Sequence, residues 1–468
     1  MFRVKLGEKI YMAEAGESLA ALLAKNGDTA VEHLCGGKGT CGKCRVRIDG
    51  RDELSCRYEI HSDIEVELYE SGEISAAVGR EESGRITENL CFALDLGTTT
   101  LALALVSLDE GKIVKTVTAN NPQRAFGADV MSRIEYCQKH TAAALQRAVV
   151  EEVNRLIAQF DGGEVEKLFV AGNTTMLHLF FGVDCTAMGV APYTPVFLES
   201  RTEAAATLGI KGVKWVTSLP SISAFVGADI VAGLHLVSAP PENKYDLLLD
   251  LGTNAEIVLY SRHRGLATSA AAGPCFEGAN ISCGMSATEG AIYAFSLGED
   301  GSPVYKTVGG RTPRGICGTG LVDMIAALLA SGIIDGSGYM ERGRYPITED
   351  VFLTDADVRQ YQLAKAAIHA AILTLMKTEK VSFDDIAHLY IAGGFSAKIR
   401  PESAAQSGLL PAALAEKAVP LANAALLGTV KFACEDHNLP PHVHAIEAID
   451  LSASPHFTEL FLESMSFS

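Results

Sequence analysis

The sequence predicts two units of different class: a small α+β domain at the N-terminus and a larger α/β region made of two related halves. Three observations support this prediction. A glycine-rich loop near the start of the chain carries three closely spaced cysteines. The run Asp-Leu-Gly-Thr occurs twice, at Asp95 and at Asp250, and each copy lies between apolar segments typical of buried strands. The chain has 468 residues, of which 48% are hydrophobic, and this is enough for more than one core.

The composition narrows the class of partner and the compartment. A net charge of −18 is unfavourable for binding polyanions, so nucleic acid is not an expected partner. The N-terminus lacks the apolar core of a signal peptide, and no run of 18 apolar residues occurs, so no membrane contact is expected. Seven of the eleven cysteines are scattered without metal-ligand spacing, which is typical of a reducing compartment. We therefore expect a cytoplasmic protein.

The first unit is predicted to cover residues 1–70. Two alternating segments around Gly7 predict a β-hairpin, and residues 18–27 predict a helix with Ser18 as N-cap and Gly27 as C-cap. The cysteine loop follows, and then further strands. This order is that of a β-grasp ferredoxin. Residues 71–90 are charged and contain glycine and serine, so they are predicted to be a linker.

The cysteines of this domain predict an iron–sulfur site. They follow the spacing C-x5-C-x2-C-x11-C at Cys35, Cys41, Cys44 and Cys56. The glycines among them allow the backbone to approach a cluster and direct N–H groups at its sulfurs. The first gap is one residue longer than in the plant-type pattern. Structural zinc usually takes two short cysteine pairs, and only one is present here, so a 2Fe–2S cluster is favoured over zinc.

The two Asp-Leu-Gly-Thr runs predict a nucleotide site. A turn that holds a polyphosphate needs glycine for close approach, hydroxyls that donate hydrogen bonds, and a carboxylate for the shell of a Mg²⁺ ion. The candidate residues of the two turns are Asp95, Gly97, Thr98, Thr99 and Thr100, and Asp250, Gly252, Thr253 and Asn254. Two such turns that face each other would hold one ATP molecule from both sides.

The α/β region is expected to run over residues 91–468, with its second lobe starting near residue 245. Helical periodicity is present at residues 142–159, 228–237, 320–331, 357–378 and 422–434. The sequence does not decide the function of three glycine-containing segments. Residues 171–176 are either a second polar turn in the site or only a helix cap. The long loop at residues 268–290 has the length of a functional loop. Gly318, Thr319 and Gly320 begin a helix and either face a nucleotide or form a structural turn.

The region resembles the ASKHA superfamily of actin, heat-shock chaperones and sugar kinases, which has a two-lobed RNase H-like fold. Its five motifs occur here in order: phosphate 1 at residues 95–100, connect 1 at 225–233, phosphate 2 at 250–254, the adenosine motif at 391–396 and connect 2 at 422–428. Asp229 matches the catalytic aspartate of sugar kinases, although it can also be a helix-capping acid. The adenosine motif contains Gly393, Gly394 and Phe395. The glycine pair can also be a plain strand-end turn.

With a ferredoxin domain in front, the chain as a whole resembles the reductive activators of corrinoid proteins. The segments that carry this resemblance are GNTTMLHLFFG, AAGPCFEGANISCGM and CGTGLVDMIAALLASGII. It implies an ATP-dependent enzyme of anaerobic metabolism that reduces cobalt(II) of a methyltransferase corrinoid protein to cobalt(I), with one electron from the cluster. Ser282 or Cys283 is a candidate contact to the corrinoid, although both can also be packing residues. Family members often have a middle domain, and only about twenty residues separate the ferredoxin domain from Cys91 here, so we expect that domain to be missing.

The implied partners are a corrinoid protein and an upstream electron donor, either a reductase or a ferredoxin, and a homodimer stays open. Three alternatives remain at this stage. The chain can activate another low-potential enzyme, although activators of that kind hold a 4Fe–4S cluster between subunits. It can be a small-molecule kinase with a redox-sensing ferredoxin domain, or a nucleotide-binding adaptor without turnover.

Overall fold

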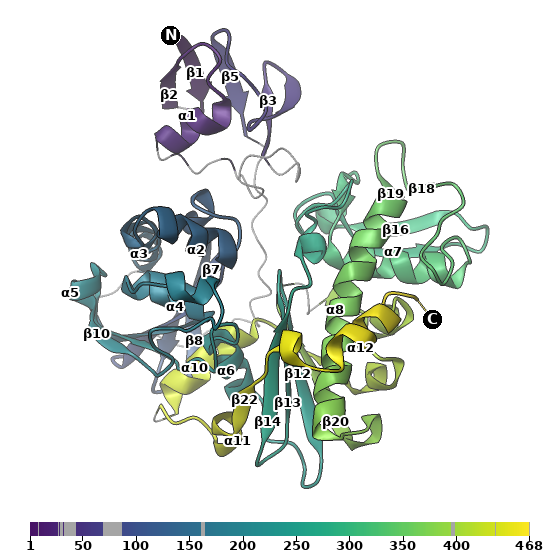
Figure 1. Cartoon of the computed structure of the whole chain (residues 1–468). Coiled ribbons are helices and arrows are strands. Elements are labelled where there is room, and N and C mark those ends of the chain that lie inside the picture. The colour runs from purple at the N-terminus through teal and green to yellow at the C-terminus, as the bar shows by residue number, and fades with distance from the viewer. Residues whose placement is uncertain are drawn as a thin grey trace.

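The computed structural model describes most of the chain and shows one small α+β domain and two α/β lobes (Figure 1). The described residues are 1–7, 9–26, 28, 31, 44–68, 87–160, 164–394, 398–435 and 437–467. Four predicted features therefore lie outside the described residues: Gly27, Cys35, Cys41 and Phe395. Most of the predicted linker at residues 71–90 also lies outside them.

In its described residues, the N-terminal domain has a five-stranded sheet and one helix, in the order that the sequence predicts. Its elements are β1 (Phe2–Leu6), β2 (Lys9–Ala13), α1 (Leu19–Lys25), β3 (Arg45–Ile48), β4 (Arg51–Leu54) and β5 (Ile64–Glu67). The strand order is β2-β1-β5-β3-β4, with β1 parallel to β5. Ser18 caps α1, because its hydroxyl oxygen accepts from the Ala21 amide at 3.2 Å. The core of this domain includes Val4, Leu22 and Val46.

The first lobe contains a six-stranded sheet of order β10-β11-β9-β6-β7-β8. Its strands are β6 (Leu90–Leu96), β7 (Thr100–Ser107), β8 (Lys112–Asn120), β9 (Val165–Gly172), β10 (Thr202–Ala204) and β11 (Val213–Ser218). Its helices are α2 (Val130–Lys139), α3 (Ala143–Ile157), α4 (Thr174–Phe181), α5 (Ala205–Leu208) and α6 (Ala228–Leu236), with short 3-10 turns η1 (Pro122–Ala125) and η2 (Thr186–Gly189). The parallel pair of β6 and β9 is buried, which explains the continuous apolar runs of both strands.

The second lobe repeats this plan with a sheet of order β21-β20-β12-β13-β14-β22. Its strands are β12 (Tyr245–Leu251), β13 (Ala255–Tyr260), β14 (Gly265–Ala270), β20 (Ile386–Ala392), β21 (Ala418–Pro420) and β22 (Ile446–Ala448). Its helices are α7 (Gly318–Ala330), α8 (Asp355–Glu379), α9 (Pro401–Gln406), α10 (Ala424–Cys434), α11 (Pro441–His444) and α12 (Phe457–Glu463). Smaller elements are β15 (Ala291–Leu297), β16 (Pro303–Thr307), β17 (Gly315–Ile316), β18 (Arg344–Pro346), β19 (Phe352–Thr354), η3 (Pro274–Glu277), η4 (Val308–Gly310), η5 (Phe383–Asp385), η7 (Ala412–Lys417) and η8 (Leu451–Ala453).

The two sheets correspond strand by strand. In each, an antiparallel hairpin is followed by a third antiparallel strand, and the first strand of the hairpin pairs in parallel with a later strand. The five predicted helical segments match α3, α6, α7, α8 and α10. Thr268 lies in β14 and is buried, so the long loop predicted from that residue begins only after Ala270.

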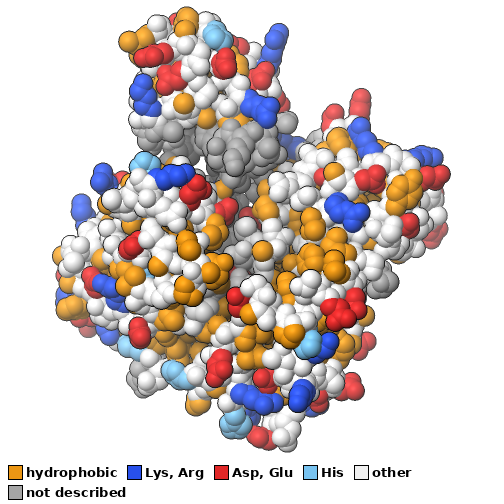
Figure 2. Space-filling view, viewed as in Figure 1, with side chains coloured by type: hydrophobic (Ala, Val, Ile, Leu, Met, Phe, Trp, Pro, Cys, Tyr) orange, Lys and Arg blue, Asp and Glu red, His pale blue; other side chains and the backbone are white. Residues whose placement is uncertain are grey.

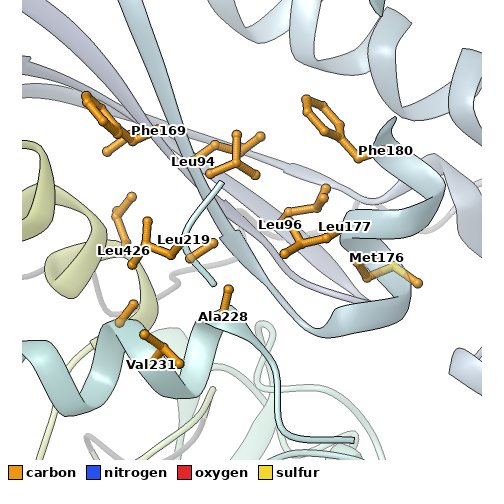
Figure 3. Packing of buried hydrophobic residues seen from close by; sticks show 14 of the residues in the cluster. Leu94, Leu96, Phe169, Met176, Leu177, Phe180, Leu219, Ala228, Val231 and Leu426 are labelled. Atoms are coloured by element: carbon orange, nitrogen blue, oxygen red, sulfur yellow. The ribbon is translucent and has the colours of Figure 1, made fainter. Parts of the chain in front are cut away.

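Helices α6 and α10 join the two lobes. They pack on each other between the two sheets (Figure 1), and α10 also packs against β6 and β9 of the first lobe. Figure 3 shows Ala228 and Val231 of α6, with Leu426 of α10, below Leu94 and Phe169 of the sheet. A Cβ at Gly428 would lie 1.9 Å from the Ala232 carbonyl oxygen, so the helices cross at backbone contact.

The surface agrees with the composition. On the face drawn in Figure 2, acidic and basic side chains are interspersed and no extended basic patch is visible. Within the described part of the chain, none of the helices combines the length and apolar character needed to cross a bilayer.

Candidate nucleotide and iron–sulfur sites

The β3–β4 hairpin brings two of the four predicted cluster ligands together. Cys44 precedes β3 and Cys56 follows β4, and their sulfurs lie 3.2 Å apart. This separation is larger than the ~2.05 Å of a disulfide bond and suits two thiolates that converge on one metal. The hairpin turn at Asp49 and Gly50 has positive φ at both positions, as a tight two-residue turn requires. Two converging cysteines at the end of a hairpin fit an iron–sulfur ligand set.

The first predicted phosphate turn, residues 97–100, connects β6 to β7 and is held by three polar side chains. Asn121 donates to the Gly97 carbonyl at 2.8 Å. Asn173 donates to the Thr98 hydroxyl at 2.8 Å and also caps α4. Arg133 donates to the Thr98 carbonyl at 2.6 Å. Residues 171–176 are therefore both a helix cap and a support for this turn, which resolves the two interpretations of that segment.

The second phosphate turn connects β12 to β13 and contacts two later segments. The Thr253 hydroxyl donates to Glu277 of η3 at 2.8 Å. Gly393 ends β20 with a φ of +99°, and a Cβ there would lie 2.2 Å from the Leu251 carbonyl oxygen. Only glycine fits this position, because both the positive φ and the close backbone contact exclude a side chain. Among the described residues, none other than the chain neighbours lies within 4 Å of a Cβ at Gly394.

Asp229 lies in the first turn of α6, and its carboxylate accepts from the Ile230 amide at 2.9 Å. The N-cap residue itself is Gly227, which has no side chain to cap the helix. A Cβ at Gly227 would lie 2.4 Å from the Cα of Asn173, so the start of α6 is pressed against the support of the first turn. Because Asp229 only partly acts as a cap, its carboxylate remains available at the site.

Four carboxylates from four elements share one electrostatic environment. Burial, together with the charges of Asp229 and Asp250, raises the pKa of Asp95 to about 8. Burial raises the pKa of Asp229 to about 6, and burial with the Asp229 charge raises the pKa of Asp250 to about 7. Glu256, opposite Asp250 in the β12–β13 ladder, has its pKa raised well above the ordinary value by burial and the same charges. Such a cluster needs cations or protons, which suits a site for a metal-bound anion.

The carboxylates are not packed closely enough to form a direct cage. In the described ranges of the chain, no three His, Cys, Asp or Glu residues are arranged to hold a metal ion among themselves. Mg²⁺ usually keeps several waters and takes phosphate oxygens. The donor set at Asp95 and Asp250 therefore fits Mg²⁺ that arrives with a nucleotide.

Gly318, Thr319 and Gly320 begin α7 as buried packing residues. Cβ atoms at the two glycines would lie 2.2 Å from the Phe276 carbonyl oxygen and 2.1 Å from that of Ile292. The Thr319 hydroxyl donates to the Tyr293 carbonyl at 2.9 Å. This packing accounts for all three residue types without a ligand, so the structure favours the structural interpretation of this turn.

Ser282 and Cys283 lie in the loop of residues 271–290, next to the start of α8. Both the amide and the hydroxyl of Ser282 donate to Asp357, at 2.7 and 3.0 Å. Asp357 also belongs to the capping box of α8. Ser282 is exposed, Cys283 is half-buried, and the first half of the loop contacts the second phosphate turn through Glu277.

Sequence patterns did not single out four residues of this site. Glu256 and Arg133 lie in β13 and α2, where periodicity marks them only as strand and helix positions. Asn121 lies between β8 and η1, and Glu277 ends η3 within the long loop. A signal was available only for Glu256, because a charge inside the apolar run of β13 departs from the pattern.

The doubled strand–turn–strand plan, the crossing helices and the shared carboxylates define a two-lobed actin-like nucleotide-binding protein with a ferredoxin-like domain in front. Family models agree with each part. Residues 4–73 match the 2Fe-2S iron-sulfur cluster binding domain, residues 90–239 match the RACo middle region, and residues 244–468 match the C-terminal domain of RACo, the ASKHA domain. The chain belongs to the RACo family of reductive activators of corrinoid proteins.

Individual proteins support the same assignment. The chain is 30% identical over 419 residues to the corrinoid activation enzyme RamQ of Eubacterium limosum, covering 80% of this chain and 70% of the relative. It is 27% identical to a Methanosarcina barkeri reductase of the Co(II) methylated amine-specific corrinoid protein, covering 80% and 76%. Among solved structures, a reductive activator for corrinoid,iron-sulfur protein superposes with a TM-score of 0.71 at 27% identity, covering 100% of this chain and 98% of that one.

One expectation was wrong. The family's middle region is present and corresponds to residues 90–239, which form the first lobe. The short distance between the ferredoxin domain and Cys91 does not show a missing domain, because the lobe that begins there is itself the middle region.

Proposed function

We propose that this chain binds Mg²⁺ and ATP between the two phosphate turns and uses ATP hydrolysis to support one-electron reduction of a cobalt(II) corrinoid protein. The observation that carries the proposal is that Asp95 and Asp250 occupy equivalent positions just before the two phosphate turns, and that burial and the charge of Asp229 raise the pKa of both. Ionising all three carboxylates together is costly without a cation. Mg²⁺ bound to a polyphosphate supplies that cation.

The roles follow from position. Asp95 and Asp250 order the waters of Mg²⁺, and Asp229 acts as general base toward the attacking water. A pKa near 6 leaves Asp229 ionised at neutral pH and therefore able to accept a proton. The polyphosphate is contacted by Gly97, Thr98, Thr99 and Thr100 on one side and by Gly252, Thr253 and Asn254 on the other. The purine lies against Gly393, Gly394 and Phe395.

In the ferredoxin domain, Cys44 and Cys56 hold the 2Fe–2S cluster together with Cys35 and Cys41. When bound, the cluster supplies single electrons at a potential of about −400 mV for plant-type sites. Each ~59 mV of uphill potential costs tenfold in reduced acceptor, so a lower-potential cobalt(I) state would form poorly without energy input. Closure of the two lobes on ATP is the two-state element that can supply this energy.

We propose that the loop of residues 271–290 connects the nucleotide to the corrinoid protein. Thr253 has one hydroxyl proton, which now goes to Glu277 at the start of the loop. If that proton turns to a phosphate, Glu277 loses its partner at Thr253, and the loop responds. We propose that this loop contributes to the docking surface, with Ser282 or Cys283 as the corrinoid contact.

The substrate class is proposed from the relatives. The Methanosarcina barkeri relative is described as acting on a methylated amine-specific corrinoid protein. We propose a corrinoid protein of a methyltransferase system, with methylamine systems as the first to test. An upstream reductase or ferredoxin would reload the cluster.

Anaerobic absorption spectroscopy tests the proposal. A cobalt(II) methylamine corrinoid protein is mixed with this chain, a chemical reductant and Mg·ATP, and cobalt(I) should appear only with all components. Asp229→Asn should retain Mg·ATP binding and lower hydrolysis by about 10²–10⁴-fold, as expected when a general base is lost. Cobalt reduction that is equally fast without ATP would contradict the proposal. ATP-dependent phosphorylation of an added sugar or acid would instead support the kinase alternative.

A further inference from the structure

Arg133 on α2 is a fully buried cation behind the first phosphate turn. Its guanidinium donates to the carbonyls of Thr98 and Gly127, at 2.6 and 3.0 Å, and to the Gln123 side-chain oxygen at 3.2 Å. The sulfur of Met176 lies 2.9 Å from the same nitrogen that contacts Gln123. The guanidinium is thus fixed by segments from four places in the first lobe.

Every one of these acceptors is neutral. A buried guanidinium is usually paired with a carboxylate, because an isolated buried charge is costly. Among the described residues, no carboxylate forms such a pair with Arg133. Asp129, four residues earlier, uses its carboxylate to cap α2 at the Ser132 amide, and Arg124 adds a second positive charge nearby. Burial lowers the pKa of Arg133 only to about 9, so it remains charged at neutral pH.

Two backbone carbonyls of the first phosphate turn are occupied by hydrogen bonds from buried side chains. The Thr98 carbonyl accepts from Arg133, and the Gly97 carbonyl accepts from Asn121. A carbonyl oxygen that faced the polyphosphate would repel it. Engaging both from behind leaves the turn free to present its hydroxyls and amides to a phosphate.

We propose that Arg133 is a positioning residue for the nucleotide: it holds the first phosphate turn in its anion-binding form and supplies a buried positive charge that balances the polyphosphate. This inference rests on the proposed function, since it takes the turn to be the phosphate site. The competing explanation is an arginine that only stabilises the first lobe.

A pair of variants at Gln123 separates charge from packing. Gln123→Glu keeps the size of the side chain and places a carboxylate at the atom that accepts from Arg133, so it neutralises the guanidinium in place. Gln123→Leu removes the hydrogen bond from Arg133 and the one to the Leu145 carbonyl without adding charge, and the bond to Leu145 is also lost in Gln123→Glu. Arg133→Lys and Arg133→Met form a second pair, in which only the first retains the cation.

The affinities of the full chain for Mg·ATP and for adenosine are measured by calorimetry. We expect Gln123→Glu to bind Mg·ATP about tenfold or more weakly than Gln123→Leu, because a charge near the phosphates is cancelled. Adenosine, which has no phosphate, should bind equally to both. The ratio of the Mg·ATP affinity to the adenosine affinity should differ less from the parent's ratio in Arg133→Lys than in Arg133→Met. Thermal unfolding checks that each variant is folded, and the Gln123 pair retains the test if Arg133→Met does not fold.

Equal Mg·ATP affinity in Gln123→Glu and Gln123→Leu would overturn the inference and leave Arg133 a structural residue. A parallel loss of ATP and adenosine binding in Gln123→Glu would do the same. A parent protein that shows no preference for Mg·ATP over adenosine is a different result, because it would overturn the proposed function as well.

Discussion

Single carboxylates at the site couple the stability of the protein to pH. Asp95 has an ordinary pKa of 3.8 and a pKa of about 8 in the folded protein. The native state therefore binds the proton that the unfolded state has already lost between these two values. Its contribution to stability is fully present below pH 3.8 and is lost as the pH rises through about 8.

At this scale we predict that the Asp95→Asn variant unfolds with a flatter pH dependence than the parent. The asparagine keeps the shape of the side chain but does not titrate. The thermal midpoints of the nucleotide-free proteins are compared from about pH 4 to about pH 8, which is the interval between the two pKa values. The midpoint of the parent should fall more steeply as the pH rises, and added Mg²⁺ should reduce the difference. Identical slopes would show that Asp95 does not carry the perturbed proton.

The glycine at the crossing of α6 and α10 acts at the scale of elements. We predict that Gly428→Ala lowers the free energy of unfolding by about 1–3 kcal/mol, the usual cost of overpacking, and weakens Mg·ATP binding. A new Cβ would meet the Ala232 backbone carbonyl, which cannot rotate away. The helices would have to separate, and the two phosphate turns would separate with them.

Gly233→Ala is the matched control on the facing helix. Its Cβ would lie 3.3 Å from a methyl group of Leu248 and 3.6 Å from the Cβ of Ala424, contacts that a small side-chain movement relieves. Denaturant unfolding and calorimetric titration of both variants give the comparison. Equal stability and equal ATP affinity in the two variants would mean that the crossing does not set the geometry of the site.

The β3–β4 hairpin gives a second prediction at this scale. Cys56→Ala should lose the visible absorbance of the cluster and the cobalt reductase activity, because one of the converging sulfurs is removed. Mg·ATP hydrolysis should stay within about twofold, since the phosphate turns lie in other sheets and distant sites act independently. The half-buried Cys434 supplies a control, and Cys434→Ala should retain both properties. Retention of the full iron and sulfide content by Cys56→Ala would remove it from the ligand set.

At the scale of the whole molecule, ATP and the corrinoid protein should be thermodynamically linked. If ATP closes the lobes and thereby changes the affinity for the partner, the partner must change the ATP affinity by the same factor. Titrations of ATP with and without cobalt(II) corrinoid protein measure this factor, which is typically about 5–150-fold for coupled sites. Glu277→Ala, which breaks the hydrogen bond to Thr253, should bring the factor closer to one. An ATP affinity that stays the same with and without the partner would rule out coupling through the lobes.

Local patterns in the sequence were sufficient for the main elements and for the two classes of domain, while the residues of the two candidate centres stay predictions. Three patterns depend only on residues close together in the sequence: the spacing of the cysteines, the two Asp-Leu-Gly-Thr runs and the apolar periodicity of α8. They can therefore be recognised without knowing where each segment lies in the fold. The predicted helix at 357–378 differs from the observed Asp355–Glu379 by only two residues at its start and one at its end. Thr268 was misplaced, because a glycine-rich stretch after a strand conceals where the strand ends.

Only the tertiary structure determined how the site is completed. Arg133 reaches Thr98 from 35 positions away, and Asn173 reaches the same turn from 75. Glu256 joins the carboxylates because β13 pairs with β12 in a register that places it opposite Asp250. The sequence predicted the first lobe, but the short distance between the ferredoxin domain and Cys91 did not reveal that this lobe is the family's middle region. Contacts between distant segments depend on how whole sheets and helices pack, and no local spacing records that packing.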